Sequence, residues 1–316
     1  MRCWALAMAG MMIGALVGLL VPDGAARAET PEIRIQDVID FYRVYDAGHG
    51  APTAAALQGY LDHGSDGLRQ FVGLRHLTGE SMAAAMEKRP GMFADAKTCL
   101  DVLPAVKRRL SQALPRLGQL YPQAKFPPIT ILVGQGNTGG TTSPSGVLVG
   151  LEALCGASWM DPNPEDRFVH LVSHEYVHVQ QPAAEHEPEH PVLLFPALLE
   201  GGAEFLAELI SGDVGYVRLK AWTKGREREV ETQFVTDMDT TNMTPWLYNG
   251  VGTAERPGDL AYWVGYRITK AYYVKAKEKR QAVARILTID AGTAKAFLAD
   301  SGWTPGMILP DKVALP

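Results

Sequence analysis

The chain has 316 residues, 47% of them hydrophobic, which is enough to bury a substantial core as one large domain or two closely joined ones. Its 30 basic and 35 acidic side chains give a formal net charge of −5 at pH 7. This balance argues against nucleic acid or an anionic lipid surface as the partner, because both attract strongly basic proteins.

The first 28 residues have the pattern of a secretory signal peptide. Arg2 precedes an apolar run over residues 4–21, and Ala26-Arg27-Ala28 satisfies the small-x-small rule for cleavage after Ala28. The apolar run is also long enough for a marginal membrane anchor, but the cleavage site that follows it favours removal. We therefore predict an exported protein, periplasmic or secreted, that is not stably inserted in a membrane after cleavage.

Two of the three cysteines, Cys99 and Cys155, follow the predicted cleavage site. In an oxidising compartment such a pair favours a disulfide, and the alternative is two buried free thiols. The chain has no CxxC motif and no cysteine beside the histidines described below. Cysteine ligation of a metal is therefore not expected.

The predicted elements are mostly helices. Residues 29–128 form an N-terminal helical region, in which apolar residues recur every three or four positions until Pro127-Pro128 interrupts the pattern. Two short β-like runs follow, Ile129–Gly134 and Gly146–Leu154, joined by a polar, glycine-rich loop. Helical patterns return near Pro164 and continue to the end of the chain. Helices before and after a small antiparallel sheet predict an α+β fold.

The stretch VSHEYVHVQQ carries His174 and His178, with Glu175 directly after the first histidine. It lies in a predicted helix over residues 164–181, for which Asn163 is a suitable N-cap. Histidines four residues apart project from one face of a helix and can close on a single ion. Glu175 is turned by about 100° from His174, the position from which a general base takes a proton from a metal-bound water.

A hydrolytic zinc site needs a third protein ligand and an open position for water. The later segment FPALLEGGAEFLAELISGD places Glu200, Glu204 and Glu208 four residues apart on one face of a predicted helix. A solvated acidic face would produce the same stripe. Gly201 and Gly202 argue against it, because each glycine costs a surface helix about 1 kcal/mol relative to alanine. They favour a close approach by another backbone or by the histidine helix itself.

These motifs resemble those of the gluzincin metallopeptidases, in which HExxH is followed by a glutamate within an EGxAE segment. The stretches GQGNTGGTTSPSGVLVGLE, SHEYVHVQQ, LEGGAEFLAE and GDLAYWVGYRITKAYY are also similar to a family of predicted bacterial zinc-dependent proteases. The resemblance implies a gluzincin-like domain over residues 129–316, with a mostly helical zincin-like core and a small sheet beside the HExxH helix. It implies one Zn²⁺ per chain and a peptide or protein substrate whose peptide bonds are hydrolysed.

The resemblance also implies a role for each residue of the site. The implied zinc ligands are His174, His178 and Glu200, and the implied base is Glu175. Glu204 falls where gluzincins place an acid that hydrogen-bonds a ligand histidine. Glu208 lies one turn beyond it, and its replacement by alanine is expected to be close to neutral.

Other histidines near the motif are expected to play lesser parts. His170, one helical step before His174, fits a hydrogen-bonded core residue better than a fourth ligand, because hydrolysis needs an open coordination position. His186 and His190, in the polar segment between the two predicted helices, fit a solvated loop better than a second metal site.

Two further residues are candidates for contacts with a substrate. A tyrosine, histidine or arginine often faces the negative charge that hydrolysis builds on the carbonyl oxygen. In AYWVGYRITKAYY we choose Tyr266 as this donor, with Tyr262 as second choice. Glu152 lies at the end of a predicted edge strand. Some aminopeptidase gluzincins use a glutamate in the equivalent strand to hold the free amine of the substrate, but the sequence around Glu152 matches their pattern poorly.

A different class of function stays open. A non-catalytic zinc-binding scaffold or a cell-envelope maintenance protein could retain the same fold and metal ligands. The presence of Glu175 weighs against this alternative, because a scaffold has no need of a base.

Overall fold

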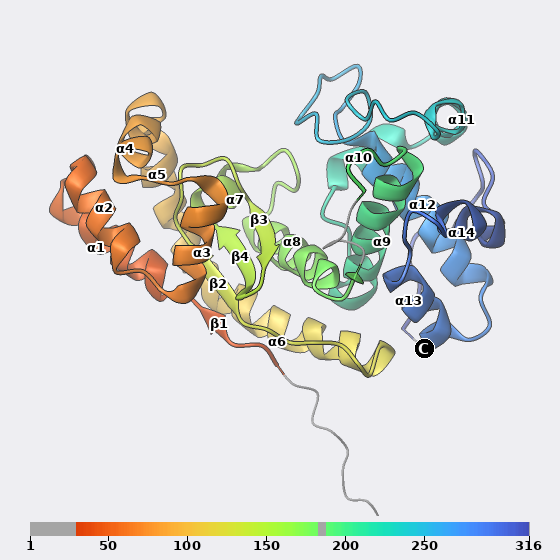
Figure 1. Cartoon of the computed structure of the whole chain (residues 1–316), viewed down its shortest axis with the longest axis horizontal. Helices are drawn as coiled ribbons and strands as arrows, with labels where there is room; N and C mark the ends of the chain where they lie inside the picture. The colour runs from red at the N-terminus through yellow and green to blue at the C-terminus, as the bar shows by residue number, and fades with distance from the viewer. Residues whose placement is uncertain (1–29, 183–187, 316) are drawn as a thin grey trace, which may run out of the picture.

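The structure is a computed structural model that describes residues 30–182 and 188–315, so the predicted signal peptide lies outside the described residues. The fold is α+β and mostly helical, as the sequence predicted (Figure 1). The helices of the described ranges are α1 (Gln36–Ala47), α2 (Ala54–Asp62), α3 (Asp66–Arg75), α4 (Gly79–Lys88), α5 (Pro90–Ala96), the 3₁₀ helix η1 (Lys97–Asp101), α6 (Leu103–Leu120), α7 (Leu151–Gly156), α8 (Pro164–His178), α9 (Leu194–Ser211), α10 (Val217–Thr223), α11 (Glu227–Asp237), α12 (Leu260–Lys275), α13 (Lys279–Leu287) and α14 (Ala294–Ser301).

The sheet of the described residues contains β1 (Ile33–Arg34), β2 (Ile129–Leu132), β3 (Gly140–Ser143) and β4 (Gly146–Gly150), in the order β1-β2-β4-β3. β1, β2 and β4 run parallel, and only the β3–β4 pair is antiparallel. The prediction of an antiparallel sheet is therefore wrong. The chain reverses between β3 and β4, so β4 returns beside β2 in the same direction.

Both β-like runs were predicted too long, and the segment between them is not simply a loop. It contains β3, which lies at the edge of the sheet, and the run that was predicted to extend to Leu154 leaves the sheet at Gly150. The reversal depends on Gly146, which has a φ of +117°, and a Cβ there would lie 2.0 Å from the Pro128 carbonyl oxygen. Only glycine fits this position.

Helix α8 begins as its sequence predicts. The Asn163 side chain accepts a hydrogen bond from the Glu165 backbone N–H at 2.9 Å, and Pro164 occupies the first turn. The helix ends at His178, three residues earlier than predicted. Gln180 and Gln181 donate their backbone N–H groups to residues only three positions earlier, so the chain tightens into a turn before Pro182.

The helices pack in layers around α9 (Figure 1). The N-terminal helices α1 and α3 pack against the sheet, α8 lies between the sheet and α9, and α12 covers the other side of α9. Every residue of α9 from Leu194 to Ile210 is buried. The acidic stripe of α9 therefore faces other helices rather than solvent.

The two glycines that the sequence analysis singled out lie in this buried helix. A Cβ on Gly201 would be 2.1 Å from the backbone of Gly265 in α12, and a Cβ on Gly265 would be 1.7 Å from the Ala197 carbonyl oxygen. The predicted close approach is therefore present at Gly201, whereas a Cβ on Gly202 would meet only side chains, the nearest of them Ile286 at 3.2 Å. The approaching backbone belongs to α12 and not to the histidine helix.

One covalent link ties the N-terminal region to the segment after the sheet. Cys99 in η1 and Cys155 in α7 form a disulfide, as predicted. Their Cα atoms are 6.1 Å apart, and 56 positions separate them in the sequence. Within the described ranges, no helix is both long and apolar enough to cross a membrane.

Candidate metal centre

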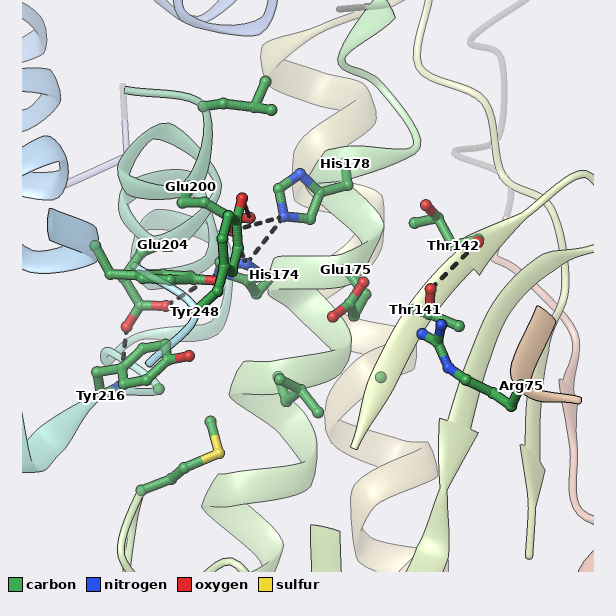
Figure 2. Close-up of a pocket in the computed structure, with 16 residues that line it drawn as sticks. Arg75, Thr141, Thr142, His174, Glu175, His178, Glu200, Glu204, Tyr216 and Tyr248 are labelled. Atoms are coloured by element: carbon green, nitrogen blue, oxygen red, sulfur yellow. Dashed lines mark hydrogen bonds and ion pairs between the residues drawn. The ribbon is translucent and has the colours of Figure 1, made fainter. Parts of the chain in front are cut away.

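Three potential ligand atoms meet between α8 and α9. His174 Nε2, His178 Nε2 and Glu200 Oε2 form a nearly equilateral triangle (Figure 2). The two nitrogens are 3.0 Å apart, and each is 3.2 Å from the carboxylate oxygen. The structure thus brings together the three residues that were predicted as ligands, and they could hold one metal ion.

The Nδ1 atom of each histidine ring forms a hydrogen bond outside the triangle, and Nε2 is the ring nitrogen that faces the triangle. His174 donates its Nδ1–H to Glu204 Oε2 at 3.2 Å, and His178 donates its Nδ1–H to Gln181 Oε1 at 2.7 Å. A neutral histidine that donates from Nδ1 offers a lone pair at Nε2. The hydrogen bond between Glu204 and a predicted ligand histidine is therefore present.

Glu200 is also held in one orientation. Its Oε1 accepts a hydrogen bond from the Tyr248 hydroxyl at 3.2 Å, which leaves Oε2 for the triangle. Tyr248 lies between α11 and α12 with a φ of +56°. A bulky residue rarely adopts this conformation, and such strained positions cluster at functional sites.

The size of the triangle suits a small divalent metal. In a tetrahedral site with bonds of about 2.0–2.1 Å, neighbouring ligand atoms lie about 3.3 Å apart. The three observed separations, 3.0 to 3.2 Å, are close to this spacing. Two imidazole nitrogens and one carboxylate oxygen are also a donor set that transition metals accept.

The charges around the triangle favour a cation at its centre. Burial alone would lower the pKa of His174, but the carboxylates of Glu200 and Glu204 outweigh it and raise this pKa to about 10. The reverse effect acts on Glu200: burial would raise its pKa, but the two histidines hold it well below the usual range. The site therefore stabilises positive charge strongly, whether a proton or a metal carries it.

A pocket of about 430 Å³ opens onto the triangle. His174, His178 and Glu200 lie on one side, the edge strand β3 lies opposite, and Glu175 projects between them (Figure 2). Gly140 of β3 makes room for Glu175, since a Cβ there would be only 2.8 Å from the Glu175 Cγ. Glu175 therefore lies beside the ligands, as its place on the helix predicts.

Burial also affects the acid strength of Glu175. It raises the pKa of this carboxyl group, although the neighbouring histidines act in the opposite direction. A carboxylate with a raised pKa takes up a proton more readily than an exposed one. Glu175 is thus suited to accept a proton from a group in the pocket.

Tyr266, the predicted donor, does not lie at this pocket. Its hydroxyl donates to Glu208 Oε2 at 2.7 Å in the core. The second choice, Tyr262, lines the pocket, and its ring is stacked on His174 with centroids 6.0 Å apart. Tyr262 and Tyr266 share one face of α12, and the crossing with α9 decides which of them faces the histidines.

Glu208 also differs from its prediction. It is buried and paired with the ammonium group of Lys270, whose Nζ lies 3.1 Å from Glu208 Oε2. Removing one partner of a buried ion pair leaves an uncompensated charge and typically costs about 3–5 kcal/mol. Replacing Glu208 with alanine would therefore destabilise the fold rather than be neutral.

Glu152 is not on an edge strand and is not available to hold a substrate amine. It lies in the first turn of α7, and its Oε1 accepts the backbone N–H groups of Gly134 and Gly136 at 3.0 and 2.8 Å. The strand before it, β4, is covered on both edges by β2 and β3. Glu152 therefore has a structural role in holding the turn after β2.

Two of the other histidines considered from the sequence, His170 and His190, are described by the structure and are not part of the triangle. His170 is buried, and its Nδ1 shares a hydrogen bond with the Ser211 hydroxyl at 2.7 Å, as expected of a core residue. His190 is exposed, and its Nε2 lies 4.0 Å from Glu189 Oε1. His186 lies outside the described residues.

Removing Glu204 tests how strongly the outer hydrogen bond supports the site. Glu204→Ala should keep its fold but bind zinc about 10- to 100-fold more weakly, because loss of such a partner typically has this effect. It also deprives the Tyr216 backbone N–H of its acceptor at 3.0 Å. Titration of the zinc-loaded protein with a chelator of known affinity measures the change.

The matched control is Glu229→Ala. Glu229 is an exposed glutamate of α11 for which the described part of the chain provides no ion pair or hydrogen bond. Its variant should bind zinc as tightly as the unaltered protein. Equal zinc affinity in both variants would mean that Glu204 does not support the site.

Several parts of the site had no signal in the sequence. Tyr248 comes from an irregular loop, Gln181 was considered only as the last residue of the predicted helix, and Gly140 lies in a segment predicted as loop. Comparisons of the chain with protein-family models, with curated proteins and with solved structures find no match. What the site can do is therefore inferred from its own residues and geometry.

Proposed function

We propose that this protein is an exported zinc-dependent metallopeptidase with a gluzincin-like core. The main support for this proposal is the position of one carboxylate. Glu175 faces the same pocket as the three predicted ligands, His174, His178 and Glu200. A metal site used only for structure has no need of an open pocket with a proton acceptor in it.

Zinc is the metal that best fits the donor set. Two histidines and one glutamate form a common ligand set of catalytic zinc, with the fourth position left for water or substrate. Bound there, zinc would lower the pKa of a coordinated water and polarise the carbonyl group of the scissile bond.

The residues of the chain supply the other parts of hydrolysis. Glu175 accepts the proton of the attacking water and can pass it to the leaving amine. The Tyr262 hydroxyl, for which the described residues provide no hydrogen-bond partner, is available to donate to an oxygen that gains negative charge. The free edge of β3 can pair with an extended peptide and hold it along the pocket.

The location of the protein is part of the same proposal. A disulfide between Cys99 and Cys155 suits an oxidising compartment, and the predicted signal peptide over residues 1–28 would direct the chain there. A non-catalytic zinc-binding scaffold remains the alternative function. It requires the ligands but gives no reason for Glu175 and the edge strand to face them.

The direct test uses protein expressed without a histidine tag. After reconstitution we expect about one zinc per chain by elemental analysis, and cleavage of an unstructured protein such as casein that stops when a chelator is added. Zinc below about half an equivalent would contradict the metal site. Stoichiometric zinc without cleavage of any peptide would favour the scaffold.

A further inference from the structure

One cationic side chain lines the pocket, and nothing in the mechanism above uses it. Arg75 is the last residue of α3 and therefore belongs to the N-terminal region, yet it lines the same pocket as Glu175 and the predicted ligands. Figure 2 shows it below Thr141 of β3, on the far side of Glu175 from Glu200. The pocket thus has the ligand triangle at one end and a guanidinium group at the other.

The Arg75 side chain forms no hydrogen bond and no ion pair with another described residue, although its charge acts to lower the pKa of the Glu175 carboxyl group. Its Nε is buried without a hydrogen-bond acceptor, and within the described ranges no carboxylate forms an ion pair with its guanidinium group. Several other half-buried or buried arginines are engaged: Arg109 contacts Glu165 and Asp166, and Arg167 contacts backbone carbonyls. A buried donor that is left unpaired lowers stability, so it is expected to have a function.

The surroundings of Arg75 indicate what it would bind. Among the described residues, the pocket lining carries the carboxylates of Glu175, Glu200 and Glu204, and Arg75 is its only arginine or lysine. A single guanidinium group matches a single carboxylate, which it can hold through two parallel hydrogen bonds. A ligand with several negative charges would be repelled by the glutamates at the other end.

We propose that Arg75 binds a carboxylate of the peptide substrate and so determines which peptides the site accepts. This inference rests on the proposed function and names its substrate class. The carboxylate has two possible sources, the C-terminus of the peptide or an aspartate or glutamate side chain. In either case the peptide lies along β3, with its carboxylate at Arg75 and its scissile bond between Glu175 and the ligand triangle.

The test measures binding, so that it does not depend on turnover. The zinc-loaded Glu175→Gln variant serves as background, and fluorescence anisotropy reports the affinity for four labelled peptide pools of otherwise neutral, randomised sequence. Two pools differ only in a C-terminal carboxylate or amide. The other two have an amidated C-terminus and carry either a glutamate or a glutamine. In one of the two pairs, we expect the pool that carries the carboxylate to bind about tenfold more tightly than the matching pool without it.

Replacing Arg75 with glutamine should remove this tenfold preference. Binding of the two pools that lack a carboxylate should stay unchanged. The matched control is Arg69→Gln, which removes the same charge from α3. Arg69 is exposed, donates hydrogen bonds to Asp66 and to the Gly64 carbonyl, and does not line the pocket. Its variant should therefore keep the preference. Arg75→Lys, which keeps the charge but loses the planar fork, should keep part of it.

The pool that shows the preference identifies the source of the carboxylate. Equal affinity for all four pools, no binding of any pool, or an equal loss across all pools in Arg75→Gln would overturn the inference. Failure of the proposed function would appear differently. The carboxylate preference would persist in the binding assay, while the protein with Glu175 intact would cleave none of the four pools.

Discussion

Replacing Glu175 with glutamine is expected to lower the rate of peptide hydrolysis by about 10²- to 10⁴-fold, the usual contribution of a general base. The zinc content should not change, because the side chain lies against Gly140 of β3 and outside the ligand triangle. Glutamine has nearly the same shape as glutamate but cannot accept a proton. The loss should therefore appear in kcat rather than in metal content.

The matched variant is Glu200→Gln, which alters a predicted ligand of the same residue type. It replaces a carboxylate oxygen that lies 3.2 Å from both histidine nitrogens. A neutral amide is a poorer zinc ligand, so this variant should lose zinc to a chelator much more easily. Elemental analysis after dialysis, beside an activity assay, separates the two effects. If Glu175→Gln loses zinc while Glu200→Gln keeps it, the assigned roles are wrong.

Replacing Gly265 with alanine is expected to destabilise the fold by about 3 kcal/mol, at the upper end of the usual range for overpacked cores. The new methyl group would lie 1.7 Å from the Ala197 carbonyl oxygen and 3.3 Å from the Gly201 Cα. Both atoms belong to the backbone of α9, so α9 and α12 would have to separate. Because α9 carries Glu200 and Glu204, the variant should also bind zinc more weakly.

Urea unfolding measures this loss, and Gly59→Ala is its control. Gly59 lies within α2, and a Cβ there would meet no atom within 4 Å. Alanine is favoured over glycine in a helix by about 1 kcal/mol, so this variant should be slightly more stable than the original protein. Equal stability of the two alanine variants would mean that α9 and α12 do not cross as closely as described.

Features that depend on one helix at a time could be predicted from the residues alone. The spacing of His174 and His178 places them on one face of α8, because a helix turns by the same angle at every residue. The N-cap of α8 follows from local hydrogen bonding at Asn163. These local rules were sufficient to place His174, His178 and Glu175 relative to one another on α8, whereas the choice of Glu200 as the third ligand came from the resemblance to the gluzincin motif.

The residues from other elements that complete the site depend on how the helices and strands pack, and they could not be predicted from the sequence. Tyr262 rather than Tyr266 faces the histidines because α12 crosses α9 at Gly201 and Gly265. The path of the chain also brings β3 and Arg75 to the far side of Glu175. Such contacts join residues far apart in the sequence, and they depend on how whole elements pack. The spacing of residues within a single helix or strand therefore cannot predict these contacts.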